Sequence, residues 1–512
     1  TQRFIPKRSL LRWYSALVFV SLRDSLVVMF DRIYLPVTGL LIVVCFLFSC
    51  THESMEDISA QPGRYPEAVA KIIETRCATA GCHNKASFVN AGGLLLDTWE
   101  HMFEGGNNGS VIVPYSPDYS SLLYFINTHA DQGPIAVPTM PLNDSPLSLD
   151  EYLTIRNWVA SGAPDVDGNI PFSSDGANRQ KIYMAMQGCD VIAVVDAASR
   201  VVMRYIPVGK STAIEQPHCV RVSKDGKYAY VSFLAGEYVQ KIDATTDELL
   251  PEAAHVGIGQ WNVIHPSEDG TQLMITDWSN TGKVIMINTA DMSVQPQFGG
   301  DFKKPHGVTS NAGFNTFYVT SELENFIYKF SFQQAYFKKV PIDEGNAPPR
   351  VIHEIIMLPG DTRYMVTCQE TDEVRVMDAI ADTLIKVIPV GIQPQELAIS
   401  TTKPYVFVTC IQDNSSWPGY VGSVYVINYN TYEVTKVEGP LFQPHGIAVD
   451  DINGTFYVVS RNASESGPPP HHTSSCQGRN GYYHVYDLNT LQRLPKRYEV
   501  SVDPYSADVR FK

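Results

Sequence analysis

Three closely spaced residues could attach a redox cofactor. Cys77 and Cys82 enclose four residues, and His83 follows at once. Two thiols beside a histidine can form two thioether bonds to the vinyl groups of haem and one axial bond to its iron. The usual attachment motif has two residues between the cysteines, so this motif is unusually long. A zinc site or a disulfide is the alternative, although zinc needs a fourth ligand and the neighbouring sequence offers no obvious one.

A second axial ligand is expected several tens of residues further along the chain. Met140 lies between Pro138 and Pro141, and the prolines stiffen the loop that presents it. Thioether ligation opposite histidine raises the reduction potential of haem relative to ligation by two histidines, which suits an electron carrier. Met140 is therefore the predicted distal ligand, and His129 is the competing candidate.

Two helices are expected to position these ligands. Residues 65–76 place apolar side chains on one helical face, so a helix leads directly into the cysteine motif. Further along, Ser148 and Glu151 form a capping box that starts a second helix over residues 149–161. The sequence thus predicts helix, cysteine motif, methionine loop and helix, in that order.

This order resembles the cytochrome c domains of exported bacterial proteins. Gly92-Gly93-Leu94, Val113-Pro114 and Ser120-Ser121-Leu122 match the middle portion of those domains. The resemblance implies a small all-α, cytochrome c-like haem domain over residues 64–164. It assigns haem c to four residues: Cys77, Cys82, His83 and Met140.

The remainder of the chain is repetitive. Short β-forming runs, each followed by a turn and a second run, recur roughly every 40 to 50 residues, which is typical of propeller blades. Residues 317–321, 407–410 and 456–460 resemble the Tyr-Val-Thr-Asn repeat of a propeller superfamily that usually has seven four-stranded blades. Six repeats begin at comparable positions: Pro217, Trp261, Pro305, Val351, Pro394 and Pro444.

A seventh blade has to be assembled from both ends of this region. Residues 181–210 supply three of its strands, and residues 504–511 resemble its missing first strand. The C-terminal strand is therefore expected to close the ring, because closure removes exposed strand edges. We predict an all-β, seven-bladed propeller over residues 180–512, joined to the haem domain by a linker over residues 165–179.

Superposing the repeats brings one polar residue from each blade to the entry of the innermost strand. Four of them are histidines that could converge in the central funnel and hold a transition metal, copper being the candidate. Polar residues that cap strands and order water are the alternative. The seven residues are Tyr505, His218, Asn262, His306, His353, Gln395 and His445.

The N-terminal segment has the features of an export signal. Residues 35–48 form an apolar run that has the length of a signal-peptide core and is too short to span a membrane. The run ends before Cys50 in a sequence that resembles the lipobox of bacterial lipoproteins, so we expect Cys50 to be lipidated. Met29 is the expected start, which makes residues 1–50 an upstream extension and a signal. An uncleaved short anchor is the alternative.

Composition narrows the function classes. The chain has 512 residues, of which 44% are apolar and 18% charged, as in soluble multidomain proteins. Its net charge of −15, without a basic stripe, argues against nucleic-acid binding. Of nine cysteines, five lie outside the signal and the haem motif, and we expect mostly buried thiols with at most one or two bridges. These five are Cys189, Cys219, Cys368, Cys410 and Cys476.

Two functions follow from this organisation. The cytochrome-plus-propeller order resembles haem-containing nitrite reductases, and the histidine ring resembles the copper propeller of nitrous-oxide reductase. The first hypothesis is an extracytoplasmic electron-transfer protein, or an oxidoreductase, whose propeller binds a substrate or second metal and whose haem exchanges electrons with a redox partner. It would be held at the membrane by its lipid anchor, in the periplasm or on the cell surface. The alternative is a non-catalytic lipoprotein whose propeller docks a protein or glycan.

Overall fold

The computed structural model describes residues 62–295, 298–331, 333–334, 336–343, 348–461, 476 and 481–512. Met29, the apolar run 35–48 and Cys50 lie outside the described residues, so the expected signal and lipid anchor stay predictions. Among the residues that the structure describes, no helix combines the length and the apolar character that crossing a membrane requires.

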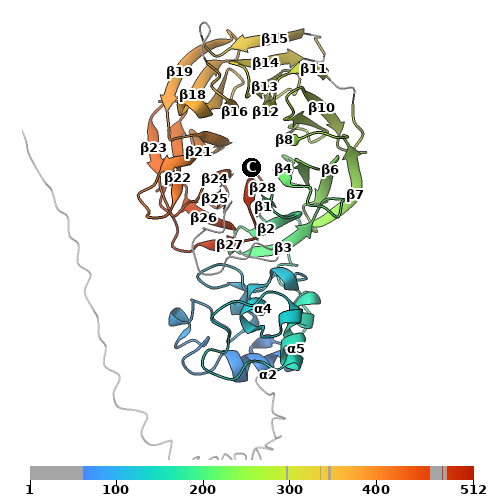
Figure 1. Ribbon diagram of the computed structural model, residues 1–512, viewed down its shortest axis with the longest axis vertical. Coiled ribbons are helices and arrows are strands. Elements are labelled where there is room, and N and C mark those ends of the chain that lie inside the picture. Colours follow the sequence, from blue (N-terminus) through green and yellow to red (C-terminus); the bar gives the residue numbers. More distant parts are fainter. Residues whose placement is uncertain are drawn as a thin grey trace, which may run out of the picture. The chain divides into compact units, whose positions relative to one another are not determined.

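Seven four-stranded antiparallel sheets form a ring of blades (Figure 1), which confirms the predicted seven-bladed propeller. The first four blades, each given from its innermost strand outward, are β28 (Pro504–Val509), β1 (Lys181–Met186), β2 (Val191–Asp196) and β3 (Val202–Pro207); β4 (Pro217–Val222), β5 (Tyr228–Phe233), β6 (Tyr238–Asp243) and β7 (Glu248–His255); β8 (Trp261–Pro266), β9 (Gln272–Asp277), β10 (Gly282–Asn288) and β11 (Phe298–Phe302); and β12 (Pro305–Ser310), β13 (Phe317–Ser321), β14 (Phe326–Ser331) and β15 (Tyr336–Pro341).

The remaining three blades follow the same plan. They are β16 (Ile352–Met357), β17 (Arg363–Cys368), β18 (Glu373–Asp378) and β19 (Thr383–Pro389); β20 (Pro394–Ile399), β21 (Tyr405–Asn414), β22 (Val421–Asn428) and β23 (Val434–Val437); and β24 (Pro444–Asp450), β25 (Thr455–Ser460), β26 (Gly481–Asp487) and β27 (Tyr498–Val500). Every blade therefore places one strand at the central channel.

The first blade is built from both ends of the propeller sequence. Strand β28, the segment expected to complete this blade, pairs antiparallel with β1, and Ala507 lies opposite Met184. On its faces β28 packs against the innermost strands of the neighbouring blades, β4 and β24. The ring therefore has no open edge at the junction between its first and last blades.

The hydrophobic core of the propeller lies between blades. Val194 of β2, for example, shares an apolar cluster with Val220 of β4 and Val231 of β5. Most inner strands are buried on both faces because each blade is covered by two neighbours. Such strands need apolar or hydrogen-bonded side chains throughout, so any polar group at the channel requires a partner.

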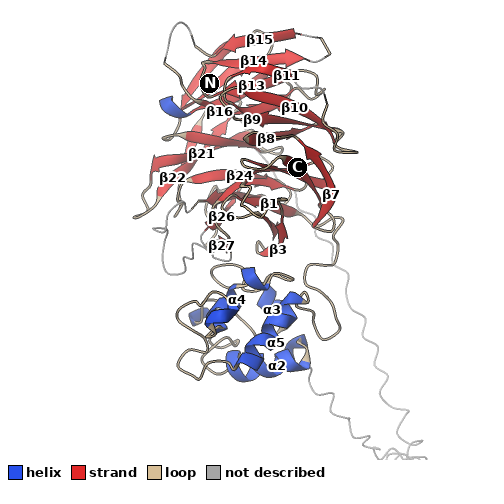
Figure 2. Cartoon of the chain, turned by 45° about the vertical axis from the view of Figure 1, so that its right-hand side comes forward, coloured by secondary structure: helices blue, strands red, loops and turns tan. Residues whose placement is uncertain are grey.

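The residues before the propeller form short helices (Figure 2). They pack around a separate apolar core that includes Tyr65, Val69, Leu123 and Trp158. The helical elements are η1 (Pro62–Arg64), α2 (Glu67–Ile72), η2 (Ile73–Cys77), η3 (Phe88–Asn90), α3 (Trp99–Phe103), η4 (Pro117–Tyr119), α4 (Ser121–Ile126), η5 (Ala130–Gln132) and α5 (Leu149–Ala160), and one further turn, η6 (Gln369–Thr371), lies in the propeller.

Both helices that the sequence predicts around the haem motif are present. The side chain of Ser148 accepts a hydrogen bond from the backbone of Glu151, and the Glu151 carboxylate accepts one from the backbone of Ser148, so the predicted capping box starts α5. The first helix differs in detail. Its α-helical part ends at Ile72, and a single π-helical turn, η2, carries the chain to Cys77. Such turns widen a helix locally and often occur at functional sites.

Candidate functional site

The cysteine motif forms a compact loop at the end of the π-helical turn. The backbone N–H of Ala78 donates to the carbonyl oxygen of Ile73 at 2.7 Å, which is the five-residue spacing of a π turn. The N–H of His83 then donates back to the carbonyl oxygen of Cys77 at 3.1 Å, so the chain closes on itself between the two cysteines. Cys77 and Cys82 are both free thiols with partly buried side chains. The four intervening residues are thus accommodated in one closed loop.

The His83 ring is oriented by its backbone surroundings. Its Nδ1 lies 3.1 Å from the carbonyl oxygen of Leu94. A carbonyl oxygen only accepts hydrogen bonds, so Nδ1 carries the proton and Nε2 has a free lone pair. Burial lowers the pKa of His83 below its ordinary value, which favours this neutral form. A neutral imidazole whose second nitrogen is fixed by a carbonyl is a typical axial metal ligand.

Met140 and His129 both lie near the core of the helical segment. Met140 packs against the same apolar cluster as Cys77 and Leu94, and its N–H donates to the carbonyl oxygen of Phe125 at 2.7 Å. The ring centroid of His129 is 6.2 Å from that of Tyr152, another residue of this cluster. Within the described part of the chain, the buried Nε2 of His129 has no hydrogen-bond partner. Met140 and His129 both therefore remain candidates for the distal ligand.

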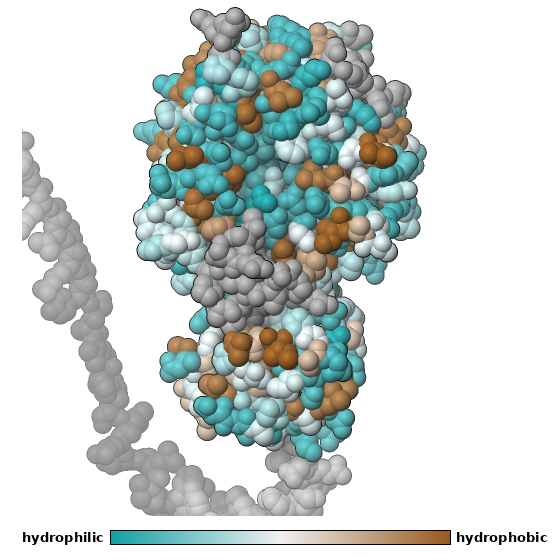
Figure 3. All heavy atoms as spheres, viewed as in Figure 1, coloured by the Kyte–Doolittle hydropathy of each residue, from teal (hydrophilic) through white to brown (hydrophobic). Residues whose placement is uncertain are grey.

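The seven polar residues of the superposed repeats all lie buried on innermost strands. The structure brings several of their rings into contact: centroids are 3.6 Å apart for His306 and His353, 3.7 Å for His445 and Tyr505, and 4.2 Å for His218 and Tyr505. Polar residues also surround the centre of the propeller face seen in Figure 3. The channel therefore contains a ring of imidazoles instead of an apolar plug.

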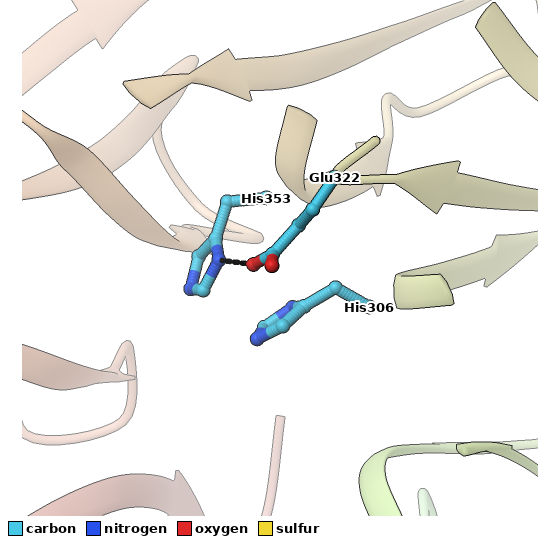
Figure 4. Close-up of side chains that lie close together, drawn as sticks. All are labelled: His306, Glu322 and His353. Carbon is cyan, nitrogen blue, oxygen red and sulfur yellow. Dashed lines mark hydrogen bonds and ion pairs between the residues drawn. The ribbon is translucent and has the colours of Figure 1, made fainter. Parts of the chain in front are cut away.

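Glu322 belongs to this cluster, although sequence reasoning missed it. It follows β13 and accepts hydrogen bonds from Trp278 Nε1 at 2.7 Å and His353 Nδ1 at 3.0 Å, and Lys304 Nζ lies 3.0 Å from it. Ligand atoms of His306, Glu322 and His353 all lie within 4.8 Å of one another. Figure 4 shows the three side chains converging from different strands. We call these three residues the funnel triad.

A second repeat position carries the signal that would have found Glu322. In most blades the residue after the second strand donates its N–H to the carbonyl oxygen of the residue before the first strand, as Glu322 does to Lys304 at 3.2 Å and Trp278 to Gln260 at 2.8 Å. Superposing this position gives another set of equivalent residues. Its members are Gln187, Leu234, Trp278, Glu322, Gln369, Ile411 and Arg461.

The titratable side chains of the channel differ in the direction in which their surroundings shift their pKa values. Burial lowers the pKa of His306 and of His445 well below the ordinary value, so both imidazoles are neutral near pH 7. Burial alone would raise the pKa of Glu322, but the hydrogen bonds from His353 and Lys304 outweigh it and lower that pKa. The funnel triad therefore offers a carboxylate beside imidazole. Glu354 differs, because burial and the neighbouring Glu396 raise its pKa.

The expectation of copper has no support in this arrangement. His218 and His445 lie outside the triad, and each has a partner on Nδ1, although Nε2 of His445, like Nε2 of His353, is buried without a hydrogen-bond partner among the described residues. Nδ1 of His218 lies 3.0 Å from Gln187 Nε2, and Nδ1 of His445 lies 3.1 Å from the carbonyl oxygen of Tyr505. The ligand group that the described residues form contains a carboxylate instead, which does not single out copper.

One pair of cysteines is bridged. Cys189, after β1, and Cys476 form a disulfide with a Cα–Cα distance of 5.4 Å across 287 residues of sequence. Cys219, Cys368 and Cys410 are free and buried. Burial raises the pKa of Cys219 to about 11 and that of Cys368 to about 12, so these thiols stay protonated and act as small apolar side chains.

Together these features define a seven-bladed β-propeller preceded by a helical segment with a haem-attachment motif. A family model described as Planctomycete cytochrome C matches residues 80–135. The match begins inside the cysteine motif, includes Cys82 and His83, and ends before Met140. This segment is thus similar to a cytochrome c family, and the similarity implies haem c.

Two solved structures align with the chain at low sequence identity. Hydrazine synthase of Kuenenia stuttgartiensis is 14% identical with a TM-score of 0.42, and the alignment covers 58% of this chain and 99% of that one. A functionally unknown protein from Desulfotomaculum acetoxidans is 9% identical with a TM-score of 0.48, covering 63% of this chain and 99% of that one. No curated protein matches the chain.

Proposed function

We propose that the chain is an exported c-type haem protein that transfers electrons outside the cytoplasm. The observation that carries this proposal is the closed Cys77–His83 loop, in which the carbonyl oxygen of Leu94 fixes Nδ1 of His83 and leaves Nε2 free. The cytochrome family match over residues 80–135 supports the same conclusion. Haem bound there would supply reversible one-electron transfer.

The donor set fits haem c. The thiols of Cys77 and Cys82 would form the two thioether bonds, and Nε2 of His83 would bind the iron. Met140 would supply a further ligand, because it packs against the apolar cluster that Cys77 also contacts. An apolar core suits a porphyrin face, and a methionine ligand raises the reduction potential. The exchange partner would be a redox protein or a small-molecule substrate.

Export and membrane attachment are part of this proposal. The signal-like run 35–48 and the lipobox-like sequence before Cys50 would direct the chain across the membrane and leave it lipidated. The Cys189–Cys476 disulfide supports an oxidising compartment, because such bonds are rare where thiols are kept reduced. The protein would then face the periplasm or the cell surface.

The test measures whether the full chain binds haem covalently when it is produced in cells that have the haem c maturation machinery. The wild type should keep haem through a denaturing gel, whereas Cys77→Ala/Cys82→Ala should lose all of it. The matched control is Cys368→Ala, a buried thiol outside the motif, which should keep the haem. A wild type that carries no covalent haem, or a double variant that keeps it, would overturn the proposal.

A further inference from the structure

The funnel triad is assembled from two blades and is almost completely enclosed. His306 lies on β12, His353 lies on β16, and Glu322 follows β13. The exposed fractions of His306, Glu322 and His353 are 1%, 5% and 4%. Their side chains point toward one another (Figure 4), and their ligand atoms lie within 4.8 Å of one another. The grouping therefore depends on the propeller fold and not on a local sequence motif.

The hydrogen bonds within the triad leave ring nitrogens unsatisfied. Nδ1 of His353 is bonded to Glu322, but among the described residues the buried Nε2 of His353 has no partner, and neither has the buried Nδ1 of His306. Oε2 of Glu354 is also without a hydrogen bond in this part of the chain, and it lies 4.0 Å from Nδ1 of His306. Buried polar atoms without partners are costly, and an unplaced ion is one explanation for such a concentration of them.

We propose that His306, Glu322 and His353 bind one divalent first-row transition ion in the propeller funnel. Two imidazoles and a carboxylate form a donor set that suits Zn²⁺ and its neighbours in the series. Three protein ligands leave a coordination position open for water or a small molecule, as in catalytic zinc sites. The ion is distinct from the haem and shares no ligand with it.

The surroundings of Glu322 are those of a supported metal ligand. Trp278 and Lys304, which lie outside the triad, hold the carboxylate oxygen Oε2, whereas Oε1 faces Nδ1 of His353 in a hydrogen bond that a shared ion would replace. Outer hydrogen bonds of this kind orient ligating carboxylates. The Lys304 side chain is 28% exposed, so its ammonium group can move toward water when a dication approaches Glu322.

A cavity lies near the triad. Its volume is about 620 Å³, and residues of the innermost strands line it, including Arg221, His265 and Glu354. Oε2 of Glu354 lies 4.0 Å from Nδ1 of His306, so the Glu354 carboxylate connects the lining of the cavity with the neighbourhood of the triad.

The experiment uses the haem-loaded full chain, stripped of loose metal with EDTA and titrated with Zn²⁺ in a calorimeter. Zinc bound after desalting is counted by elemental analysis, and haem iron is counted separately from the haem spectrum. We expect one zinc per chain, on the order of 100-fold weaker binding in Glu322→Gln, and unchanged binding in His218→Ala. Glu322→Gln keeps the shape of the side chain, and its cooperative unfolding in EDTA should match that of the wild type.

The outcomes separate the triad from its alternatives. His306→Ala is a second variant that should lose zinc binding. With two such variants, a folding defect in one of them cannot decide the result. If zinc does not bind the wild type, or if Glu322→Gln and His306→Ala both keep it, the proposal is wrong. Loss in His218→Ala with retention in Glu322→Gln would indicate the four-histidine ring instead. Loss only in Cys77→Ala/Cys82→Ala would place zinc at the cysteine motif, and that result would count against the haem proposal as well.

Discussion

The cysteine loop and the propeller funnel organise histidines in opposite ways. In the loop, the residues that matter lie between Cys77 and His83, and one backbone carbonyl, that of Leu94, orients the imidazole. In the funnel, His306 and His353 are 47 positions apart (353 minus 306) and meet only because their strands occupy equivalent places in neighbouring blades. Local chain geometry makes the first site, whereas closure of the ring makes the second.

This difference predicts which changes to the chain each site tolerates without losing its ligand. The proposed haem ligands, from Cys77 to Met140, all lie in the helical segment, so we expect this site to need that segment and not the propeller. A site formed across blades needs the whole ring, because each ligand is placed by a different sheet. Variants that open the ring should therefore abolish metal binding in the funnel and leave haem attachment at the cysteine loop intact.

The largest effect is expected from removing β28. A chain that ends at Asp503 loses the buried residues Tyr505, Ala507 and Val509, and with them the contacts of β28 with β4 and β24. We expect the propeller to lose its cooperative unfolding transition, followed by tryptophan fluorescence, and to lose zinc binding. Covalent haem should persist on a denaturing gel, because Cys77 and Cys82 lie in the helical segment.

The matched control for this truncation is a change on an outer strand. Leu384→Ser on β19 alters a side chain that is 42% exposed, so it should change the free energy of unfolding by no more than about 0.5 kcal/mol. If the truncated chain unfolds as cooperatively as the wild type, ring closure is not what organises the funnel, and the contrast drawn between the two regions is wrong.

The same contrast explains what the sequence could predict. The seven blades followed from repeated strand pairs, and the residues of β28 were recognisable because the first blade lacked a strand. The capping box of Ser148 and Glu151 was readable because its contacts span three residues. The π-helical turn before Cys77 was not readable, since a shift from four-residue to five-residue hydrogen bonds leaves no clear sequence pattern.

The funnel was only half predictable. The repeat alignment placed His306 and His353 at one channel position, but it could not tell which rings would meet. Glu322 was missed because it follows the second strand, at a position that is Leu234 in one blade and Arg461 in another. The repeat marks this position, but the residue type differs between blades, so the role of Glu322 depends on partners such as Trp278 that lie in the preceding blade.

The next prediction concerns the distal ligand of the cysteine loop. If Met140 binds iron opposite His83, Met140→His should lower the reduction potential by a few tenths of a volt, within the roughly 0.8 V that axial ligands span. His129→Ala should leave both the potential and the visible spectrum unchanged. Potentiometric titration of the three proteins checks this. A shift in His129→Ala together with an unchanged Met140→His potential would make His129 the ligand.

A pH experiment tests the propeller independently of its metal site. Burial, and to a lesser degree Arg493 and Arg497, lower the pKa of His484 on β26 to about 3. In the unfolded chain this pKa is about 6.5, so unfolding takes up a proton between pH 6.5 and 3. Stability contributed by neutral His484 is therefore present above pH 6.5 and is lost as the pH falls below it, by about 1.4 kcal/mol per pH unit.

The measurement for His484 is urea unfolding of the propeller from pH 6 to pH 4.5. His484→Gln does not titrate, so its free energy of unfolding should depend less steeply on pH than that of the wild type, by about 1.4 kcal/mol per unit. The matched control is His255→Gln, which removes a half-exposed histidine with a 61% exposed side chain and should leave the slope nearly unchanged. Equal slopes in wild type and His484→Gln would contradict the lowered pKa.

The smallest effect is expected from Trp278→Phe, which sharpens the distinction between a ligand and a residue that orients one. The indole N–H of Trp278 donates to Oε2 of Glu322 at 2.7 Å, and phenylalanine cannot replace that bond. Because the ligand atoms themselves remain, zinc binding should weaken by about 10-fold, well short of the loss in Glu322→Gln. Calorimetric titration gives the affinity, and an unchanged haem spectrum serves as the control. An affinity equal to that of the wild type would show that Lys304 orients the carboxylate without the indole. A loss as large as that in Glu322→Gln would mean that the packing of the channel depends on the indole.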